Sequence, residues 1–234
     1  MTQAIFTNAW ISQTAKTMFR GAAPPVSNKF YIGLAQTDSL SRNSPLASFI
    51  SNELSSADYT RLQFNLADDG GYNTNTNRHE FSPVTITFTP STTTWQFQTA
   101  FLLANGHSVA SMGFSSSDVN SATNRITISN HPWTSGDRLV FTADDLATLP
   151  TGIDAGTIYQ VLSPTTNDFA LALVNSSVAI DIQNTGSSTF RARSANGIIA
   201  TFAIEPSLIT LLPGQPHSYQ IPIALMNTGY VNGS

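Results

Sequence analysis

The chain has 234 residues, only 10% of them are charged, and the formal net charge is −4 at pH 7. A chain of this length can bury a substantial core, and its many Thr, Ser, Asn and Gln residues predict a neutral polar surface, which suits packing among many neighbouring subunits. Two lysines and scattered arginines give no electrostatic footprint for nucleic acid, and the absence of cysteine excludes disulfides and thiolate metal sites. No segment approaches the ~20 apolar residues of a membrane-spanning helix, and the first residues lack the basic start and apolar core of a secretory signal.

Residues 1–27 are predicted to form a short amphipathic helix followed by an extended linker. Thr7 or Asn8 is a suitable N-cap, and Gly21 stands just past the expected end of the helix. The apolar face of this helix carries Trp10, Ile11 and Met18. Two roles are open for that face. It covers the β-domain of its own chain, or it docks onto a neighbouring subunit, because a three-turn helix is marginally stable unless its apolar face is covered.

The stretch Trp95–Gly106 organises the rest of the chain. Large residues recur at every second position from Trp95 to Leu103, as in a half-buried strand, and Asn105-Gly106 favours a tight turn. No partner strand follows until residues 197–205. The sequence therefore predicts an all-β fold, in which a β-sandwich-like domain with a short N-terminal helix is interrupted by an inserted small β-barrel or sandwich module.

This interpretation divides the chain into four parts. They are the helix and linker at 1–27, the parent β-domain at 28–106 plus 195–226, the inserted β-module at 107–194, and a C-terminal tail at 227–234. Strands of the parent are expected at 29–36, 59–66, 84–88, 95–103, 197–205 and 219–225, with a turn at Glu205-Pro206. Residues 37–57 are expected to form a long surface loop, and residues 68–78 a loop rich in turn formers.

The inserted module is predicted to contain a series of short strands of its own. Alternating apolar residues are separated by turn signals such as Ser135-Gly136-Asp137 and Thr185-Gly186. Five or six such strands are enough for a small barrel or sandwich. Because the module begins and ends at nearly the same place in the parent, it can fold as a unit without disturbing the parent.

No catalytic, metal-binding or cofactor-binding motif stands out in the sequence. One candidate metal or acid–base cluster consists of Asp68, Asp69, His79 and Glu80. These residues lie in or beside a loop rich in Gly, Asn and Thr, where Asp is favoured because it caps turns. His131 is interpreted as a surface or hydrogen-bonded turn residue. We therefore expect no catalytic residue, no metal and no cofactor, and we interpret the chain as a non-enzyme.

Aromatic residues in loops are candidate ligand contacts. Tyr72 and Trp133 lie in predicted loops, where an exposed ring can stack on a sugar. Trp95, in contrast, belongs to an alternating strand and is expected in the core. A saccharide-binding, receptor-recognition protein is therefore one open alternative.

Two parts of the chain resemble known phage proteins. The order of an N-terminal helix, a Gly-Ala-Ala-Pro-Pro linker, Lys29–Asp38 (KFYIGLAQTD), Glu53 and Tyr59-Thr60-Arg61 resembles small tail-associated virion proteins of tailed bacteriophages. Those proteins carry a G-Y-x-R segment, and Asp58 stands here in place of its glycine. The insert is similar to a β-module that recurs in phage structural and tail-fibre proteins. The segments that carry this similarity include Asn124–Ile128 (NRITI), Ser135–Phe141 (SGDRLVF) and Gly156–Val161 (GTIYQV).

The resemblance implies a non-enzymatic virion structural protein of a tailed phage, made in the host cytoplasm and placed in the tail, as a tail-tip baseplate or fibre component. Its expected partners are other virion proteins and further copies of the chain in a symmetric homo-oligomer, with a host surface saccharide as a further candidate. Neither nucleic acid nor membrane insertion is expected. A head-decoration, or capsid cement, protein is the second open alternative.

Overall fold

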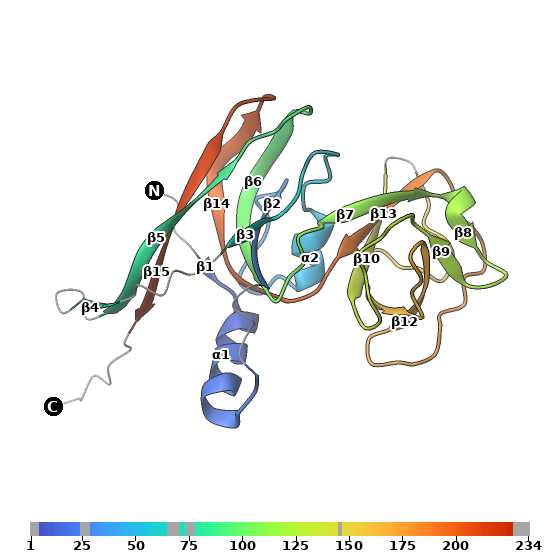
Figure 1. Ribbon diagram of the computed structural model, residues 1–234, viewed down its shortest axis with the longest axis horizontal. Coiled ribbons are helices and arrows are strands. Elements are labelled where there is room, and N and C mark those ends of the chain that lie inside the picture. The colour runs from blue at the N-terminus through green and yellow to red at the C-terminus, as the bar shows by residue number, and fades with distance from the viewer. Residues whose placement is uncertain (1–4, 24–28, 65–70, 74–77, 145–146, 227–234) are drawn as a thin grey trace.

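The computed structural model describes residues 5–23, 29–64, 71–73, 78–144 and 147–226. Strands make up 42% of the chain and helices 12%, which confirms the predicted all-β class with a short N-terminal helix. Figure 1 shows two β-rich bodies joined by crossing segments of the chain, with the N-terminal helix projecting from the larger body. The expected tail at 227–234 lies outside the described residues.

Helix α1 spans Asn8–Arg20, as its capping residues predict. The Thr7 hydroxyl accepts a hydrogen bond from the Trp10 backbone N–H at 3.2 Å, and Gly21 ends the helix in the left-handed region at φ 64°. Trp10 packs edge-on against Phe30 of the first sheet, with ring centroids 6.3 Å apart. One apolar side chain of α1 is therefore partly covered by its own chain.

A second helix, α2 (Leu46–Ser51), occupies the centre of the stretch 37–57 that the sequence predicted as a surface loop. That prediction was wrong because the side chain of Phe49 is completely buried. It packs edge-on against Phe101 and Phe202, with ring centroids 5.8 and 5.2 Å away. The helix is too short to show a periodic pattern, and burial against the sheet stabilises it.

The first sheet of the larger body has the strand order β1-β14-β6-β2-β3. Its strands are β1 (Ile5–Phe6), β14 (Ile198–Leu211), β6 (Trp95–Ala104), β2 (Phe30–Ala35) and β3 (Leu62–Phe64). β14 pairs antiparallel with β6, with Phe202 opposite Phe101, so the predicted strands on either side of the insert are partners. The turn predicted at Glu205-Pro206 is instead an irregularity between Ile204 and Ile209 within one continuous strand.

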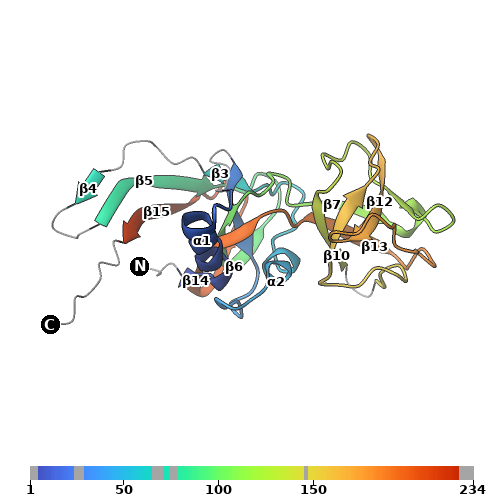
Figure 2. The same ribbon diagram turned by 90° about the horizontal axis from the view of Figure 1, so that it is seen from below.

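The second sheet of the larger body consists of β15 (His217–Met226), β5 (Arg78–Phe88) and β4 (Gly71–Asn73), in that order. β4 lies in the stretch predicted as a loop, so that part of the prediction was wrong. The two sheets share a core that includes Phe88, Trp95 and Phe97, as in a sandwich. Figure 2 shows β5 and β15 running side by side beyond the first sheet.

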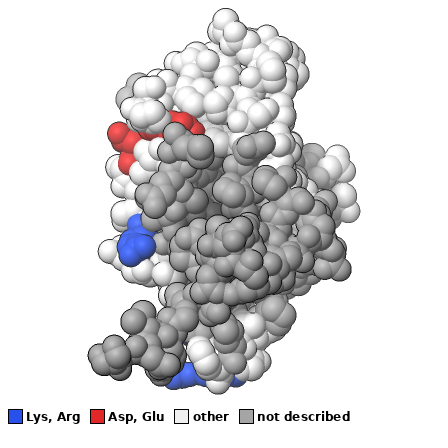
Figure 3. Space-filling view, turned by 90° about the vertical axis from the view of Figure 1, so that its left-hand side faces the viewer, with Lys and Arg blue, Asp and Glu red and all other residues white. Residues whose placement is uncertain are grey.

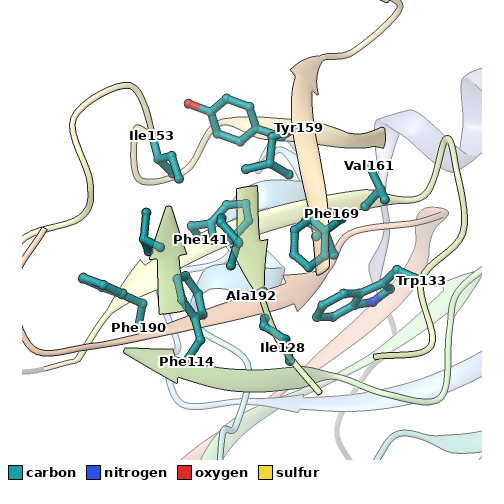
Figure 4. Close-up of a cluster of buried hydrophobic side chains, with 14 of the residues drawn as sticks. Phe114, Ile128, Trp133, Phe141, Ile153, Tyr159, Val161, Phe169, Phe190 and Ala192 are labelled. Atoms are coloured by element: carbon teal, nitrogen blue, oxygen red, sulfur yellow. The ribbon is translucent and has the colours of Figure 1, made fainter. Parts of the chain in front are cut away.

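The smaller body is a seven-stranded sheet whose strands all lie within residues 107–194. In sheet order they are β7 (Ser111–Ser115), β13 (Thr189–Ser194), β10 (Arg138–Ala143), β11 (Ile158–Leu162), β12 (Asp168–Leu173), β9 (Arg125–Thr127) and β8 (Val119–Asn120). A short 3-10 helix, Ser116–Asp118, precedes β8. The sheet wraps around its own core of aromatic and branched side chains, among them Phe141, Tyr159, Phe169 and Phe190 (Figure 4).

Candidate functional site

The chain passes between the two bodies twice. The outward crossing runs through Asn105 and His107, the return crossing runs through Ser194 and Gly197, and the two crossings touch. Asn105 adopts a left-handed φ of 58°, in line with the turn predicted at Asn105-Gly106. Gly197, on the return crossing, has φ 100°, and a Cβ there would lie 2.2 Å from the Ala104 carbonyl oxygen. Glycine is required at this position because no side chain fits between the crossings. The insert therefore enters and leaves the parent at one point.

A fully buried ion pair lies beside these crossings. Arg61 Nη2 and Nε donate to the two carboxylate oxygens of Glu53 at 2.6 and 2.8 Å, and both side chains are 0% exposed. The remaining donors of Arg61 reach the carbonyl oxygens of His107 at 3.0 Å and Ser194 at 2.8 Å, one on each crossing. One guanidinium group thus holds both crossings against the parent domain.

Tyr59 completes the pairing on the parent side. Its hydroxyl donates to Glu53 Oε1 at 2.9 Å and accepts from the Leu34 backbone N–H at 2.8 Å. Space beside the pair is also filled, because a Cβ on Gly33 would lie 2.4 Å from the Phe101 ring and 2.8 Å from the Glu53 carboxylate. Strand β2 must therefore carry glycine where it passes the ion pair.

Arg193 joins the insert to the same cluster. Its Nη1 donates to the Glu53 backbone carbonyl at 2.7 Å, and its Nε donates to Thr142 Oγ1 on the neighbouring strand at 2.9 Å. Apolar contacts support this polar junction, since Ala47 and Ile50 of α2 pack in one buried cluster with Val140 and Ala195 at the insert. Helix α2 therefore lies between the first sheet and the insert, as Figure 1 shows.

Burial and the neighbouring charges shift the pKa values of Tyr59 and Arg61 in this network. Burial raises the pKa of the Tyr59 hydroxyl well above its ordinary value, and the Glu53 carboxylate adds to the rise. Burial alone would lower the pKa of Arg61, but attraction to Glu53 outweighs it and the pKa is raised. At neutral pH Tyr59 is a neutral donor and Arg61 is a cation. The network thus connects the two bodies through buried hydrogen bonds and one buried ion pair.

An open cleft of about 490 Å³ lies next to the network, at the same junction. Its lining comes from the residue before β2, from both crossings, from the insert loop before β10 and from the first residue of β10. The residues include Lys29, His107, Thr134, Asp137, Arg138 and Asn196. Both bodies thus contribute polar and charged groups to one cavity.

Asp58 has a separate, structural task in the parent domain. Its carboxylate accepts hydrogen bonds from the backbone N–H groups of Ser91 at 2.8 Å and Thr92 at 2.7 Å, and from Trp95 Nε1 at 2.9 Å. Partial burial would raise the pKa of Asp58, but hydrogen bonds from Thr93, Thr92 and Trp95 hold it well below the ordinary value. The aspartate caps the turn between β5 and β6.

The prediction that Trp133 contacts a ligand from a loop was wrong. Trp133 is 3% exposed, packs edge-on against Phe169, and donates its indole N–H to Ser194 Oγ at 2.8 Å. His131, interpreted as a surface or hydrogen-bonded turn residue, is hydrogen-bonded, because its Nε2 lies 3.4 Å from the Asp168 carbonyl oxygen, but it is buried and not on the surface. Its ring stacks on Trp133, with ring centroids 5.5 Å apart. Both residues belong to the core of the insert because the loop that carries them folds over the end of the sheet.

Two further predicted site residues have described side chains, and both lie on α1. Ile11 is 51% exposed on α1, whereas the Trp10 ring is half-buried against Phe30. The side chains of Met18 and Tyr72 lie outside the described residues, although the Tyr72 backbone belongs to β4 and not to a loop. The cluster of Asp68, Asp69, His79 and Glu80 also lies outside the described residues or side chains.

The residues of the junction could have been found from one signal in the sequence. In a chain with so few charges, Glu53 and Arg61 each stand next to apolar residues, Leu54 and Leu62. A charge in such a setting usually has a buried partner. The sequence does not show that the two residues are partners, because the turn between them sets their geometry.

No group of His, Asp and Glu side chains that could hold a metal ion is found among the described residues. Within the same residues, no helix is long and apolar enough to cross a membrane. No family model, curated protein or solved structure matches the chain.

Proposed function

We propose that the protein is a non-enzymatic structural component of a tailed-phage particle, assembled with other tail subunits in a baseplate or fibre. One observation carries the proposal. Glu53, Tyr59 and Arg61, which take part in the resemblance to tail-associated proteins, are the residues of the buried network that joins the two bodies. A buried network of this kind fixes the shape of the chain, which fits a structural building block.

The surface supports the same proposal. The described surface in Figure 3 carries few charged side chains, in keeping with the low charge of the whole chain. On α1, Phe19 is 81% and Ile11 51% exposed, although removing large apolar side chains from water lowers the free energy. We assign these two side chains to a contact with a neighbouring subunit of the particle.

The test uses a phage whose copy of this chain carries Ile11→Ser and Phe19→Ser. We expect the variant chain to fold, as checked by circular dichroism, and to be depleted about tenfold from purified particles, because an interface that loses two apolar contacts weakens by at least ~1.4 kcal/mol. Quantitative mass spectrometry of the particles measures the depletion.

The matched control is Leu173→Ser with Val178→Ser, which removes two apolar side chains that are 56% and 73% exposed on the insert. Particles should incorporate this control at the wild-type level. Normal incorporation of the α1 variant would show that α1 does not hold the chain in the particle.

A further inference from the structure

The cleft at the junction has an uneven distribution of charge. Lys29 lies on its parent side and Arg138 on its insert side, and both side chains are exposed. Within the described part of the chain, neither side chain takes part in a hydrogen bond or an ion pair. Two cations thus line one cavity of a protein whose net charge is −4.

His107 adds a third donor. Its Nδ1 accepts a hydrogen bond from the Val109 backbone N–H at 3.1 Å, so in the neutral ring the proton is on Nε2. Burial lowers the pKa of His107, and the nearby cations Arg61 and Lys29 lower it further against the attraction of Asp137. The neutral ring therefore presents an N–H donor at the cleft.

Among the described residues that line the cleft, Asp137 is the one that carries a carboxylate, and its oxygen atoms already accept hydrogen bonds. Asp137 Oδ2 accepts hydrogen bonds from the Thr134 backbone N–H at 2.7 Å and from the Thr134 hydroxyl at 3.0 Å. Its Oδ1 accepts from Asn196 Nδ2 at 2.8 Å. These bonds hold the loop before β10 against the return crossing and use the acceptor atoms of Asp137. Its single negative charge faces the two positive charges of Lys29 and Arg138.

We propose that this cleft binds a small organic anion through a carboxylate or phosphate group. Lys29 and Arg138 supply the positive charge from opposite sides, and His107 supplies a directed N–H donor. The volume of about 490 Å³ lies within the ~300–1,000 Å³ of small-molecule sites and accepts a molecule as large as an acidic monosaccharide. Because both bodies contribute donors, binding depends on the fixed junction, and it does not depend on the role proposed for the chain in a particle.

The test is a titration of the purified full-length chain, followed by amide chemical shifts at constant ionic strength. The probes are inorganic phosphate, D-glucuronate and, as a neutral sugar, D-glucose. We expect saturable binding of at least one anion, with shifts at His107 and Asn196, and no binding of glucose. Tighter binding of glucuronate would identify a sugar acid as the ligand class, and tighter binding of phosphate would identify a phosphorylated ligand.

The variant Lys29→Gln with Arg138→Gln should weaken anion binding at least about tenfold, because each removes a charged hydrogen-bond donor. Lys16→Gln with Arg20→Gln makes the same change of charge on exposed residues of α1 and should bind like the wild type. The proposal is overturned if neither anion saturates, if glucose binds equally well, or if both double variants weaken binding to the same extent.

Discussion

Replacing Arg61 by Met should lower the free energy of unfolding by about 3–5 kcal/mol, because the change removes the cation that is hydrogen-bonded to the buried Glu53 carboxylate. The wild-type pair is 0% exposed on both sides, so water cannot take the place of the lost partner. The variant also loses the donors to the carbonyl oxygens of His107 and Ser194. Urea denaturation followed by circular dichroism at pH 7 measures the difference.

Two variants show whether burial is the cause. Arg125→Met breaks a pair with Asp168 whose side chains are 27% and 34% exposed, and it should cost less than about 1 kcal/mol. Glu53→Met combined with Arg61→Met removes both members of the buried pair and should be more stable than Arg61→Met alone. An Arg61→Met protein within about 1 kcal/mol of the wild type would mean that the network does not stabilise the junction.

Replacing Phe49 by Ala should cost about 3–5 kcal/mol, through lost burial and the cavity that remains. The ring is 0% exposed and packs edge-on on Phe101 and Phe202, so it attaches α2 to the first sheet. Since α2 also packs against the insert through Ile50, the variant should loosen the junction as well. Thermal and urea denaturation give the size of the loss.

Phe19→Ala is the control for this second prediction. It removes the same ring from α1, where the side chain is 81% exposed, and should change the stability of the isolated chain by less than about 0.5 kcal/mol. Equal effects of the two variants would contradict the assignment of Phe49 to the core.

Patterns that are local in the sequence predicted the fold well. The cap at Thr7 and the glycine at position 21 set the ends of α1, since both act within one turn of the helix. The alternation from Trp95 to Leu103 predicted a strand, and no partner strand follows it directly in the sequence. The next segment with the same period, at 197–205, was therefore predicted as the partner, and β14 does pair with β6. Both features rest on short-range rules.

Features that depend on tertiary contacts were missed. Helix α2 is six residues long, too short for a periodic signal, and its burial follows from the sheet that it covers. Trp133 stands in a loop by local sequence, yet the loop folds back so that its ring joins the core of the insert. The network combines Glu53, just after α2, with Arg61, just before β3, and with carbonyl groups of both crossings. These residues are too far apart in the sequence for a local pattern to connect them.

The junction links the architecture to the proposed role. An inserted body that is connected to its parent by only two peptide segments is expected to change its orientation relative to the parent. Here Arg61 and Arg193 add hydrogen bonds across the junction, and α2 adds apolar contact. A fixed angle between the two bodies suits a subunit that must repeat the same contacts throughout a particle.

The most direct test of the proposed role is to count copies of the chain in purified phage, with head and tail fractions measured separately by quantitative mass spectrometry. The proposal of a baseplate or fibre component predicts a low copy number, found with the tails. A copy number comparable to that of the major capsid protein, found with the heads, would instead indicate a head-decoration protein. Absence from both fractions would contradict a virion role altogether.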